Sequence, residues 1–354
     1  MYGISIFLGE ALTEQVEDYI YEMNRIGFKG IFTSLHIPED DSALYADRLK
    51  QLGQIAHQLQ MKLMVDISGE ALNRAGFSFD DVDSILAIGV TGLRMDYAIS
   101  NQKIAEISKK MDVGLNASTI TMQDISELKQ YDADFTRFEA WHNYYPRPET
   151  GLSSQFLNTK NKWLKEVGFK IFAFTPGNNL FRGPLYQGLP TLEKHRFLNP
   201  LSATIDLKRN FAVDGIYIGD PSISTRSQHQ FESYIKAKTL LLEVVDVGSK
   251  YYKTILGAHV NRQDDARDVI RSADARFKKI DVVLPEQAIE RRMGSVTIDN
   301  EKYGRYMGEI QLTKRDLPSD EKVNLAAEVV NEDQSLINLI EPGYKFNLVE
   351  KGML

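Results

Sequence analysis

The chain has 354 residues, of which 43% are hydrophobic and 26% charged, and its formal net charge is -7. Such a composition is typical of a globular protein with room for two domains, or for one large barrel with an appendage. The acidic balance disfavours a nucleic-acid partner, and the lack of cysteine excludes disulfides, thiolate nucleophiles and cysteine-ligated zinc. The opening residues, MYGISIFLGEALTEQ, do not resemble a signal peptide, and no apolar run approaches the ~20 residues that span a membrane. We therefore expect a cytoplasmic protein with no membrane partner.

Strand-like and helix-like stretches alternate from the start to about residue 240. The predicted strands are GISIFL, KGIFTSL, MKLMVDIS, TGLRMD, DVGLNAS, DFTRFEA, KIFAF and DGIYIG. The predicted helices cover residues 13–26, 42–60, 80–88, 101–111, 122–131, 152–167 and 228–241. Eight such units are the pattern and size of a TIM (β/α)8 barrel. A doubly wound open sheet is the alternative, but no Gly-rich dinucleotide-binding turn follows the first strand.

The sequence changes character after about residue 244. A charged stretch, HVNRQDDARDVIRSADAR, precedes the short strand-like runs VTIDN, YMGEIQLT, KVNLAAEVV, LINLI and YKFNLV. Turn residues separate these runs. We therefore predict a barrel domain over residues 1–243 and a small β-rich domain over residues 244–354.

The active site of a TIM barrel is built at the C-terminal ends of its strands and in the loops that follow. Applied to the predicted strands, this rule selects Ser34, His36, Asp66, Asp96, Asn116, Glu139, His142, Thr175 and Asp220. Four of these residues are carboxylates, and burying a carboxylate is costly unless it is paired or takes part in the reaction. Paired carboxylates suit glycoside hydrolysis, in which one protonates the leaving oxygen and another acts as base or nucleophile. Structural roles stay open: Asp96 could pair with Arg94, and Asp220 could cap a turn before Pro221.

Two other chemistries fit these strand ends less well. A Schiff-base aldolase needs a lysine at a strand end, and none of the eight offers one. His36, Asp66, Glu139 and His142 could gather around a metal ion, but no H-x-H or H-E-x-x-H spacing supports such a site. We therefore expect neither a metal nor another cofactor.

The loop after the sixth strand, WHNYYPRPETG, carries candidate sugar contacts. Trp141, Tyr144 and Tyr145 could stack on the apolar face of a sugar, and Arg147 could contact an anion. The alternative is that these aromatic residues pack beneath the loop against the neighbouring helix.

The loop after the seventh strand, TPGNNLFRGPLYQGLPTLEKHR, contains three glycines and three prolines and is therefore neither helix nor sheet interior. Long loops inside compact domains are usually functional. Its Arg182, Lys194, His195 and Arg196 suit a phosphate or a sugar acid, and TIM barrels often bind phosphate near the loops after strands seven and eight. A merely structural surface loop is the alternative.

The motifs HNYYPRPETGL, FTPGNNLFRGPLYQGLPTLEKHR and GLRMD resemble those of the 6-phospho-N-acetylmuramidases, the MupG-type enzymes. The resemblance covers the whole chain and implies a TIM barrel followed by a cyclophilin-like β domain. It also implies intracellular hydrolysis of N-acetylmuramic acid 6-phosphate β-1,4-linked to N-acetylglucosamine, after a phosphotransferase system imports cell-wall fragments. It supplies no catalytic pair, so the roles of Asp66, Asp96, Glu139 and Asp220 rest on their strand positions.

The candidate residues and the resemblance to this family both indicate a site for a phosphorylated sugar. The phosphate and lactyl carboxylate of such a substrate require cations, which Arg147, Arg182, His195 and Arg196 could supply. The 2-acetamido group of the sugar could also act as an internal nucleophile, with one carboxylate orienting it and another serving as acid. A phosphosugar-binding regulator and a phosphosugar isomerase or epimerase stay open as alternatives. No oligomeric state follows from these motifs.

Overall fold

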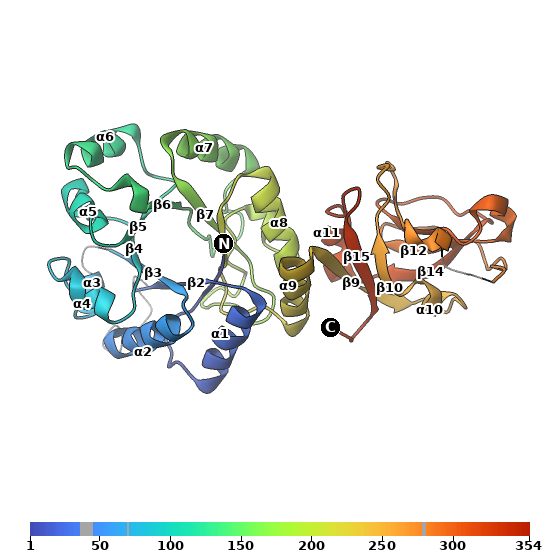
Figure 1. Ribbon diagram of the computed structural model, residues 1–354, viewed down its shortest axis with the longest axis horizontal. Coiled ribbons are helices and arrows are strands. Elements are labelled where there is room, and N and C mark those ends of the chain that lie inside the picture. The colour runs from blue at the N-terminus through green and yellow to red at the C-terminus, as the bar shows by residue number, and fades with distance from the viewer. Residues whose placement is uncertain (36–44, 69–70, 278–280) are drawn as a thin grey trace. The chain divides into compact units, whose positions relative to one another are not determined.

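The computed structural model describes residues 1–35, 45–68, 71–277 and 281–354 (Figure 1). These residues form two compact units, Met1–Ser224 and Thr225–Leu354. The predicted division after residue 243 falls within a strand of the second unit. No helix among the described residues is both long enough and apolar enough to cross a membrane.

The first unit is a closed barrel of eight parallel strands in sequence order, with the last strand paired to the first. The strands are β1 (Tyr2–Ser5), β2 (Gly30–Ser34), β3 (Lys62–Ile67), β4 (Gly92–Met95), β5 (Asp112–Asn116), β6 (Phe138–Trp141), β7 (Lys170–Thr175) and β8 (Gly215–Ile218). The helices are α1 (Glu14–Ile26), α2 (Tyr45–Gln58), α3 (Ala71–Arg74), α4 (Val82–Ala87), α5 (Asn101–Ser108), α6 (Met122–Gln130), α7 (Ser154–Val167) and α8 (Pro200–Asn210). Helices surround the strands (Figure 1), so the predicted TIM barrel is confirmed.

Local sequence signals explain where several of these helices begin. Ser100 and Ser153 each accept a hydrogen bond from a backbone amide in the first turn of α5 and α7, and Thr121 forms a reciprocal capping box with Asp124 in α6. The helix α8 has no counterpart among the predicted ranges. It begins at an Asn-Pro pair, in which the Asn199 side chain accepts from two backbone amides.

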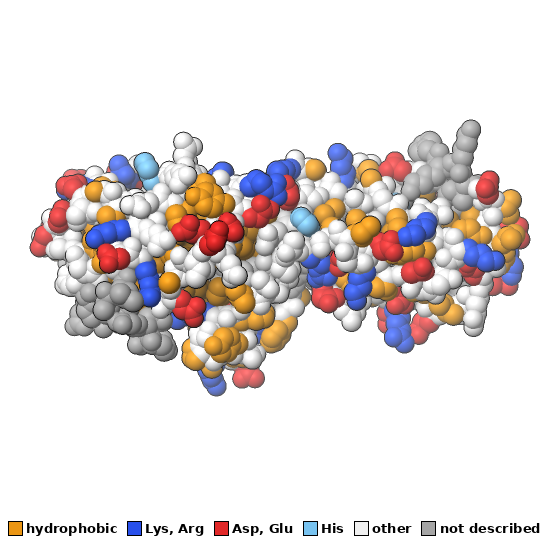
Figure 2. Space-filling model, turned by 90° about the horizontal axis from the view of Figure 1, so that it is seen from below, with side chains coloured by type: hydrophobic (Ala, Val, Ile, Leu, Met, Phe, Trp, Pro, Cys, Tyr) orange, Lys and Arg blue, Asp and Glu red, His pale blue; other side chains and the backbone are white. Residues whose placement is uncertain are grey.

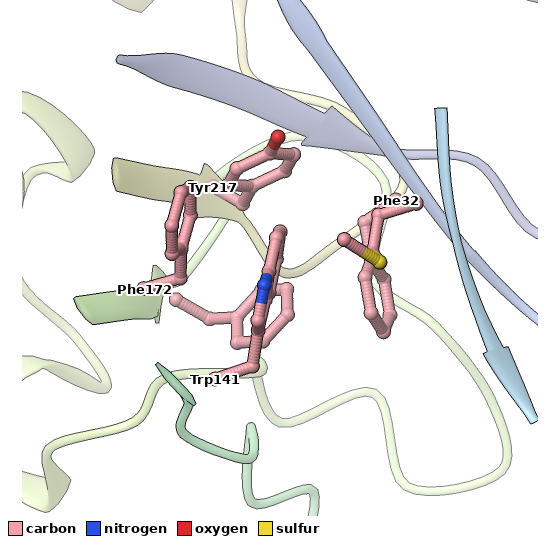
Figure 3. Packing of buried hydrophobic residues seen from close by; sticks show 6 residues of the cluster. Phe32, Trp141, Phe172 and Tyr217 are labelled. Atoms are coloured by element: carbon pink, nitrogen blue, oxygen red, sulfur yellow. The ribbon is translucent and has the colours of Figure 1, made fainter. Parts of the chain in front are cut away.

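Aromatic side chains fill the interior of the barrel (Figure 3). The cluster comprises Phe32, Met64, Trp141, Phe172, Phe174 and Tyr217. The rings of Trp141 and Phe172 stack with centroids 4.4 Å apart. Glycine makes room for these rings, since a Cβ at Gly3 would lie 2.1 Å from the Tyr217 ring. Trp141 is therefore a core residue, and the expectation that it stacks on a sugar is wrong.

The second unit contains a seven-stranded mixed sheet in the order β10-β15-β9-β14-β12-β13-β11. Its strands are β9 (Thr239–Asp246), β10 (Gly257–Val260), β11 (Val269–Arg271), β12 (Ser295–Asp299), β13 (Ile310–Thr313), β14 (Val323–Val329) and β15 (Lys345–Glu350). Its helices are α9 (Thr225–Ala237), α10 (Tyr252–Ile255) and α11 (Gln334–Ile337). All strand pairs are antiparallel except β15 with β9.

Two predictions for this unit are wrong. The helix expected over residues 228–241 ends at Ala237, and the run that follows is strand β9. The run LINLI forms part of the short helix α11 and the turn after it, because a short apolar run does not distinguish a buried strand from a buried helix.

The surface carries charges of both signs. On the face shown in Figure 2, basic and acidic side chains are interspersed with hydrophobic ones. Acidic and basic side chains are thus mixed over this face.

Candidate active site

Asp66 and Arg94 form a buried ion pair at the carboxyl end of the barrel. The two residues are register partners on β3 and β4, and Arg94 Nη1 donates to Asp66 Oδ1 at 2.6 Å. Ser34, the last residue of β2, donates its hydroxyl to Asp66 Oδ2 at 2.9 Å. Burial raises the pKa of Asp66, and the charge of Arg94 opposes this rise. Three adjacent strands thus each contribute one member of the group.

Asp96 lies beside this pair, directly after β4. Its Oδ1 is 3.6 Å from Arg94 Nη1 and accepts from Asn116 Nδ2, at the end of β5, at 3.1 Å. The Asp96 side chain is 24% exposed, against 12% for Asp66, so Asp96 is the more accessible of the two carboxylates. We call Ser34, Asp66, Arg94, Asp96 and Asn116 the acid cluster.

A chain of contacts leads from the acid cluster to the β7 loop, residues 176–199. Arg94 Nη2 donates to Asn143 Oδ1 in the β6 loop, residues 142–153. The next residue, Tyr144, packs edge-on against Phe174 with centroids 5.2 Å apart, and its hydroxyl accepts from Arg182 Nη1 at 3.3 Å. Burial raises the pKa of Tyr144 to about 12, so its hydroxyl stays protonated at neutral pH.

Arg182 borders a pocket of about 670 Å³ between the start of the first unit and the β7 loop. The pocket is lined in part by Phe7, Leu12, Val16, Phe181 and Tyr186. The Arg182 guanidinium lies over the Phe7 ring, 4.8 Å from its centroid. Among the described residues, no carboxylate lies within ion-pair distance of Arg182. The pocket therefore combines apolar walls and the Glu10 carboxylate with a cation that has no ion-pair partner among the described residues.

Glu139 does not lie with the other carboxylates. Its Oε1 is 3.7 Å from Lys62 Nζ, and Lys62 is the first residue of β3. Its register partner on β7 is Lys170, the first residue of that strand. Its Oε2 accepts from the indole of Trp141 at 3.0 Å. Glu139 thus belongs to the amino ends of the strands, at the opposite end of the barrel from Asp66.

Asp220 follows β8 and is 1% exposed. Its Oδ2 accepts from the backbone amides of Gly177 and Leu189, at 2.8 and 2.9 Å. Its visible contacts are therefore with the backbone of the β7 loop and not with the acid cluster.

His142 and Thr175 face away from the barrel mouth. His142 Nε2 lies 2.7 Å from Asn161 Oδ1 on α7, and the Thr175 hydroxyl lies 3.5 Å from that of Thr204 on α8. Both residues are fully buried, and burial lowers the pKa of His142 to about 4. Their contacts are those of residues that pack helices onto the barrel.

His195 and Arg196 hold the β7 loop in place. His195 Nε2 lies 2.7 Å from Asp206 Oδ2 on α8. Arg196 donates to both oxygens of Glu193, at 2.7 and 2.6 Å, and to the carbonyl of Tyr145 at 3.0 Å. The hydrogen bonds from Arg196 lower the pKa of Glu193 to about 2. These contacts tie the β6 and β7 loops together, which leaves Arg196 little capacity to bind an anion.

The two remaining candidates are Arg147 and His36. Arg147 is exposed, and its backbone carbonyl accepts from Arg196 Nη2. His36 lies outside the described residues. In the part of the chain that is described, no group of three or more histidine, aspartate or glutamate side chains could hold a metal ion.

The structure also brings in residues that the sequence pattern did not select as site residues. The sequence pattern indicates Arg94 only as a structural partner of Asp96, and it does not select Asn143. A signal for Arg94 does exist, since Arg94 and Asp96 are two residues apart and thus on one face of an extended segment. Asn143 carries no comparable signal, because its role depends on how the β6 loop folds over Arg94.

Comparisons with known proteins agree with this architecture. The N-terminal and C-terminal models of the 6-phospho-N-acetylmuramidases match residues 2–233 and 239–349. A crystal structure of a conserved Enterococcus faecalis protein of unknown function is 55% identical, with a TM-score of 0.93, covering 99% of this chain and 97% of that one. An uncharacterized B. cereus protein is 24% identical and shares the fold, with a TM-score of 0.73 and 99% of both chains covered. No curated protein matches the chain. The two family matches together span nearly the whole sequence, and the chain therefore belongs to the 6-phospho-N-acetylmuramidase family of glycosidases.

Proposed function

We propose that this glycosidase hydrolyses the β-1,4 bond between N-acetylmuramic acid 6-phosphate and N-acetylglucosamine. The observation that carries the proposal is the acid cluster at the barrel mouth, joined through Asn143 and Tyr144 to an Arg182 without a carboxylate partner among the described residues. Glycosidic cleavage needs carboxylates, and a phosphorylated sugar needs a cation.

Within the acid cluster, we assign the proton transfer to Asp96. Both oxygens of Asp66 already accept from donors within the cluster, Arg94 and Ser34. Asp96 is more exposed, and no hydrogen bond to its Oδ2 is present among the described residues. Asp96 can therefore reach the glycosidic oxygen as general acid, while Asp66, held by Arg94 and Ser34, stabilises positive charge at the anomeric carbon or orients the 2-acetamido group.

Arg182 suits the phosphate for two reasons. Its guanidinium is planar and matches phosphate oxygens with two parallel hydrogen bonds. It also borders a pocket whose volume of about 670 Å³ lies within the range of small-molecule sites, with Phe181 and Tyr186 available to contact a sugar ring. Arg147 is the second candidate, because it is exposed on the neighbouring β6 loop.

The test is incubation with the 6-phosphorylated disaccharide and with its unphosphorylated form, following released N-acetylglucosamine. We expect release from the phosphorylated substrate with a much higher kcat/KM. Comparable values for the two forms would contradict the role of a phosphate site. Binding without release would instead support a regulator, and conversion without a second sugar would support an isomerase or epimerase.

We further propose that the reaction takes place in the cytoplasm and recycles imported, phosphorylated cell-wall fragments. The family match and the cysteine-free sequence support this setting. The resemblance to the family also supports a cyclophilin-like fold for the second unit, whose seven-stranded sheet is mixed and mostly antiparallel.

A further inference from the structure

The segment after β8 forms a row of contacts with the β7 loop. Asp220 Oδ2 accepts from the amides of Gly177 and Leu189, near the two ends of the loop segment that contains Arg182. Ser222 Oγ accepts from the Leu180 amide at 3.2 Å, and the Ser224 amide donates to Asn178 Oδ1 at 2.9 Å. Residues 220, 222 and 224 therefore contact the loop at every second position.

The two segments approach each other so closely that two glycines are required. A Cβ on Gly177 would lie 2.7 Å from the Cβ of Asp220 and 2.5 Å from the carbonyl oxygen of Ser222. A Cβ on Gly219 would lie 2.2 Å from the carbonyl oxygen of Leu189. A side chain at either glycine would therefore push the two segments apart.

The carboxyl group of Asp220 is itself closed off from solvent. The residue is 1% exposed, and its Oδ1 is buried with no hydrogen-bond partner among the described residues. A general acid must come within hydrogen-bond reach of the proton it transfers. Asp220 instead directs Oδ2 at the backbone amides of Gly177 and Leu189, and the backbone amide of Arg182 also interacts with its carboxyl group.

From these contacts we propose that Asp220 is a positioning residue that fixes the loop segment 177–189 and thereby the guanidinium of Arg182. The inference rests on the proposed function for its effect on catalysis, because Arg182 is assigned to the substrate phosphate there. Its structural part is independent of that assignment. Asp220 acts through the loop, so its loss weakens recognition of the phosphate without removing the proton transfer of Asp96.

Two substitutions at Asp220 separate positioning from acid catalysis. In Asp220→Asn, the amide oxygen can still accept from the backbone amides of Gly177 and Leu189, while the negative charge of the carboxylate is lost. Asp220→Ala removes the acceptor. For a positioning role we expect Asn to keep kcat within a few-fold of the wild type, and Ala to raise KM for the phosphorylated disaccharide roughly tenfold or more.

Loop order has its own readout that requires no substrate. Phe181, Leu185 and Tyr186 are 38%, 45% and 63% exposed and offer chymotrypsin cleavage sites within the fixed segment. We expect faster cleavage there in Asp220→Ala and near wild-type cleavage in Asp220→Asn. Asp333→Ala is the matched control, since Asp333 is a buried carboxylate of the second unit that also accepts a backbone amide, and it should leave this cleavage unchanged.

The outcomes decide between the roles. Unchanged loop cleavage in Asp220→Ala overturns the positioning role, as does an equal loss of kcat in the Asn and Ala variants with a changed pH profile. If Asp220→Ala does not fold, Ser222→Ala decides in its place: faster cleavage supports the proposal and unchanged cleavage overturns it. A wild-type protein inactive on the phosphorylated disaccharide contradicts the proposed function, while the cleavage pattern still decides the role of Asp220.

Discussion

Asp66 and Arg94 face each other across adjacent strands, and their side chains meet at 2.6 Å although only 12% and 4% of them are exposed. Breaking such a pair leaves one charge buried without its partner, whereas replacing both members removes that penalty. The pair therefore contributes to the stability of the barrel and also fixes the positions of two side chains at its mouth.

We expect Arg94→Met to lower the free energy of unfolding by about 3–5 kcal/mol, because it leaves the Asp66 carboxylate buried and unpaired. The double variant Asp66→Asn/Arg94→Met should recover part of this loss. Lys110→Met is the control, since Lys110 pairs with Asp83 at the surface and such pairs contribute roughly 0–1 kcal/mol. Urea unfolding of the four proteins measures these differences, and equal losses for Arg94→Met and Lys110→Met would contradict the burial argument.

The two ends of the barrel give a matched pair of carboxylates for a kinetic test. We expect Asp96→Asn to lower kcat by roughly 10²–10⁴-fold, as the loss of a general acid does. Glu139→Gln should keep kcat near the wild-type value, because Glu139 lies with Lys62 at the amino ends of the strands.

A substrate with a different leaving group provides the control for the comparison of Asp96→Asn with Glu139→Gln. An aryl glycoside with an acidic leaving group needs little protonation, so Asp96→Asn should lose much less activity on it than on the disaccharide. A severe loss of kcat in Glu139→Gln, with normal turnover in Asp96→Asn, would move the chemistry to the other end of the barrel.

The position of Glu139 shows that the sequence pattern predicts the barrel strands but not the residue at which each strand begins. The short apolar runs predict all eight barrel strands, since each strand is buried both on the face towards the helices and on the face towards the interior. They do not fix where a strand begins. DFTRFEA reads as one strand with Glu139 near its end, whereas residues 135–137 form a short 3-10 helix and β6 begins at Phe138. Glu139 therefore falls at the amino end.

The sequence pattern also does not predict whether a side chain at a strand end faces the barrel mouth or the surrounding helices. The strand-end rule selects Asp66 and Asn116, which face the mouth, and equally Thr175 and His142, which face helices. Which of two consecutive residues faces inward depends on barrel register, which requires the neighbouring strands. The Asp66–Arg94 pair depends on register in the same way, so it is visible only in the folded barrel.

His142 should make the stability of the protein depend on pH. Its Nε2 donates to Asn161 Oδ1, because the Asn161 amide nitrogen is engaged by the carbonyl of Phe211. Burial lowers its pKa from 6.5 to about 4, so the unfolded chain binds a proton between these pH values and the folded chain does not. Stability from this group therefore falls as pH drops through this window, by about 3 kcal/mol in total.

Replacing His142 with glutamine tests this dependence. The glutamine amide can donate to Asn161 and does not titrate, so the fall in unfolding free energy between pH about 6.5 and about 4 should become shallower. His57→Gln, at an exposed position of α2, controls for the loss of a histidine. Urea unfolding across the window measures both, and a slope unchanged by His142→Gln would contradict the account.

Arg182 and Arg196 lie in one loop but should respond differently to replacement by lysine. The Arg182 guanidinium contacts only the Tyr144 hydroxyl and the Phe7 ring among the described residues, so its remaining N–H groups are available to an anion. The Arg196 guanidinium donates hydrogen bonds to Glu193 and to backbone carbonyls of the β6 and β7 loops. A lysine would reproduce neither the bidentate phosphate contact proposed for Arg182 nor the many contacts that Arg196 makes.

We expect Arg182→Lys to lower kcat/KM for the phosphorylated disaccharide roughly tenfold to a hundredfold, with little change for the unphosphorylated form and in Tm. Arg196→Lys should lower Tm and reduce activity on both substrates in similar proportion, because it releases the β6 and β7 loops together. Steady-state kinetics on both substrates and a thermal melt distinguish the two patterns. Equal losses on both substrates in Arg182→Lys would mean that this arginine only braces its loop, and the phosphate would then be assigned to the exposed Arg147.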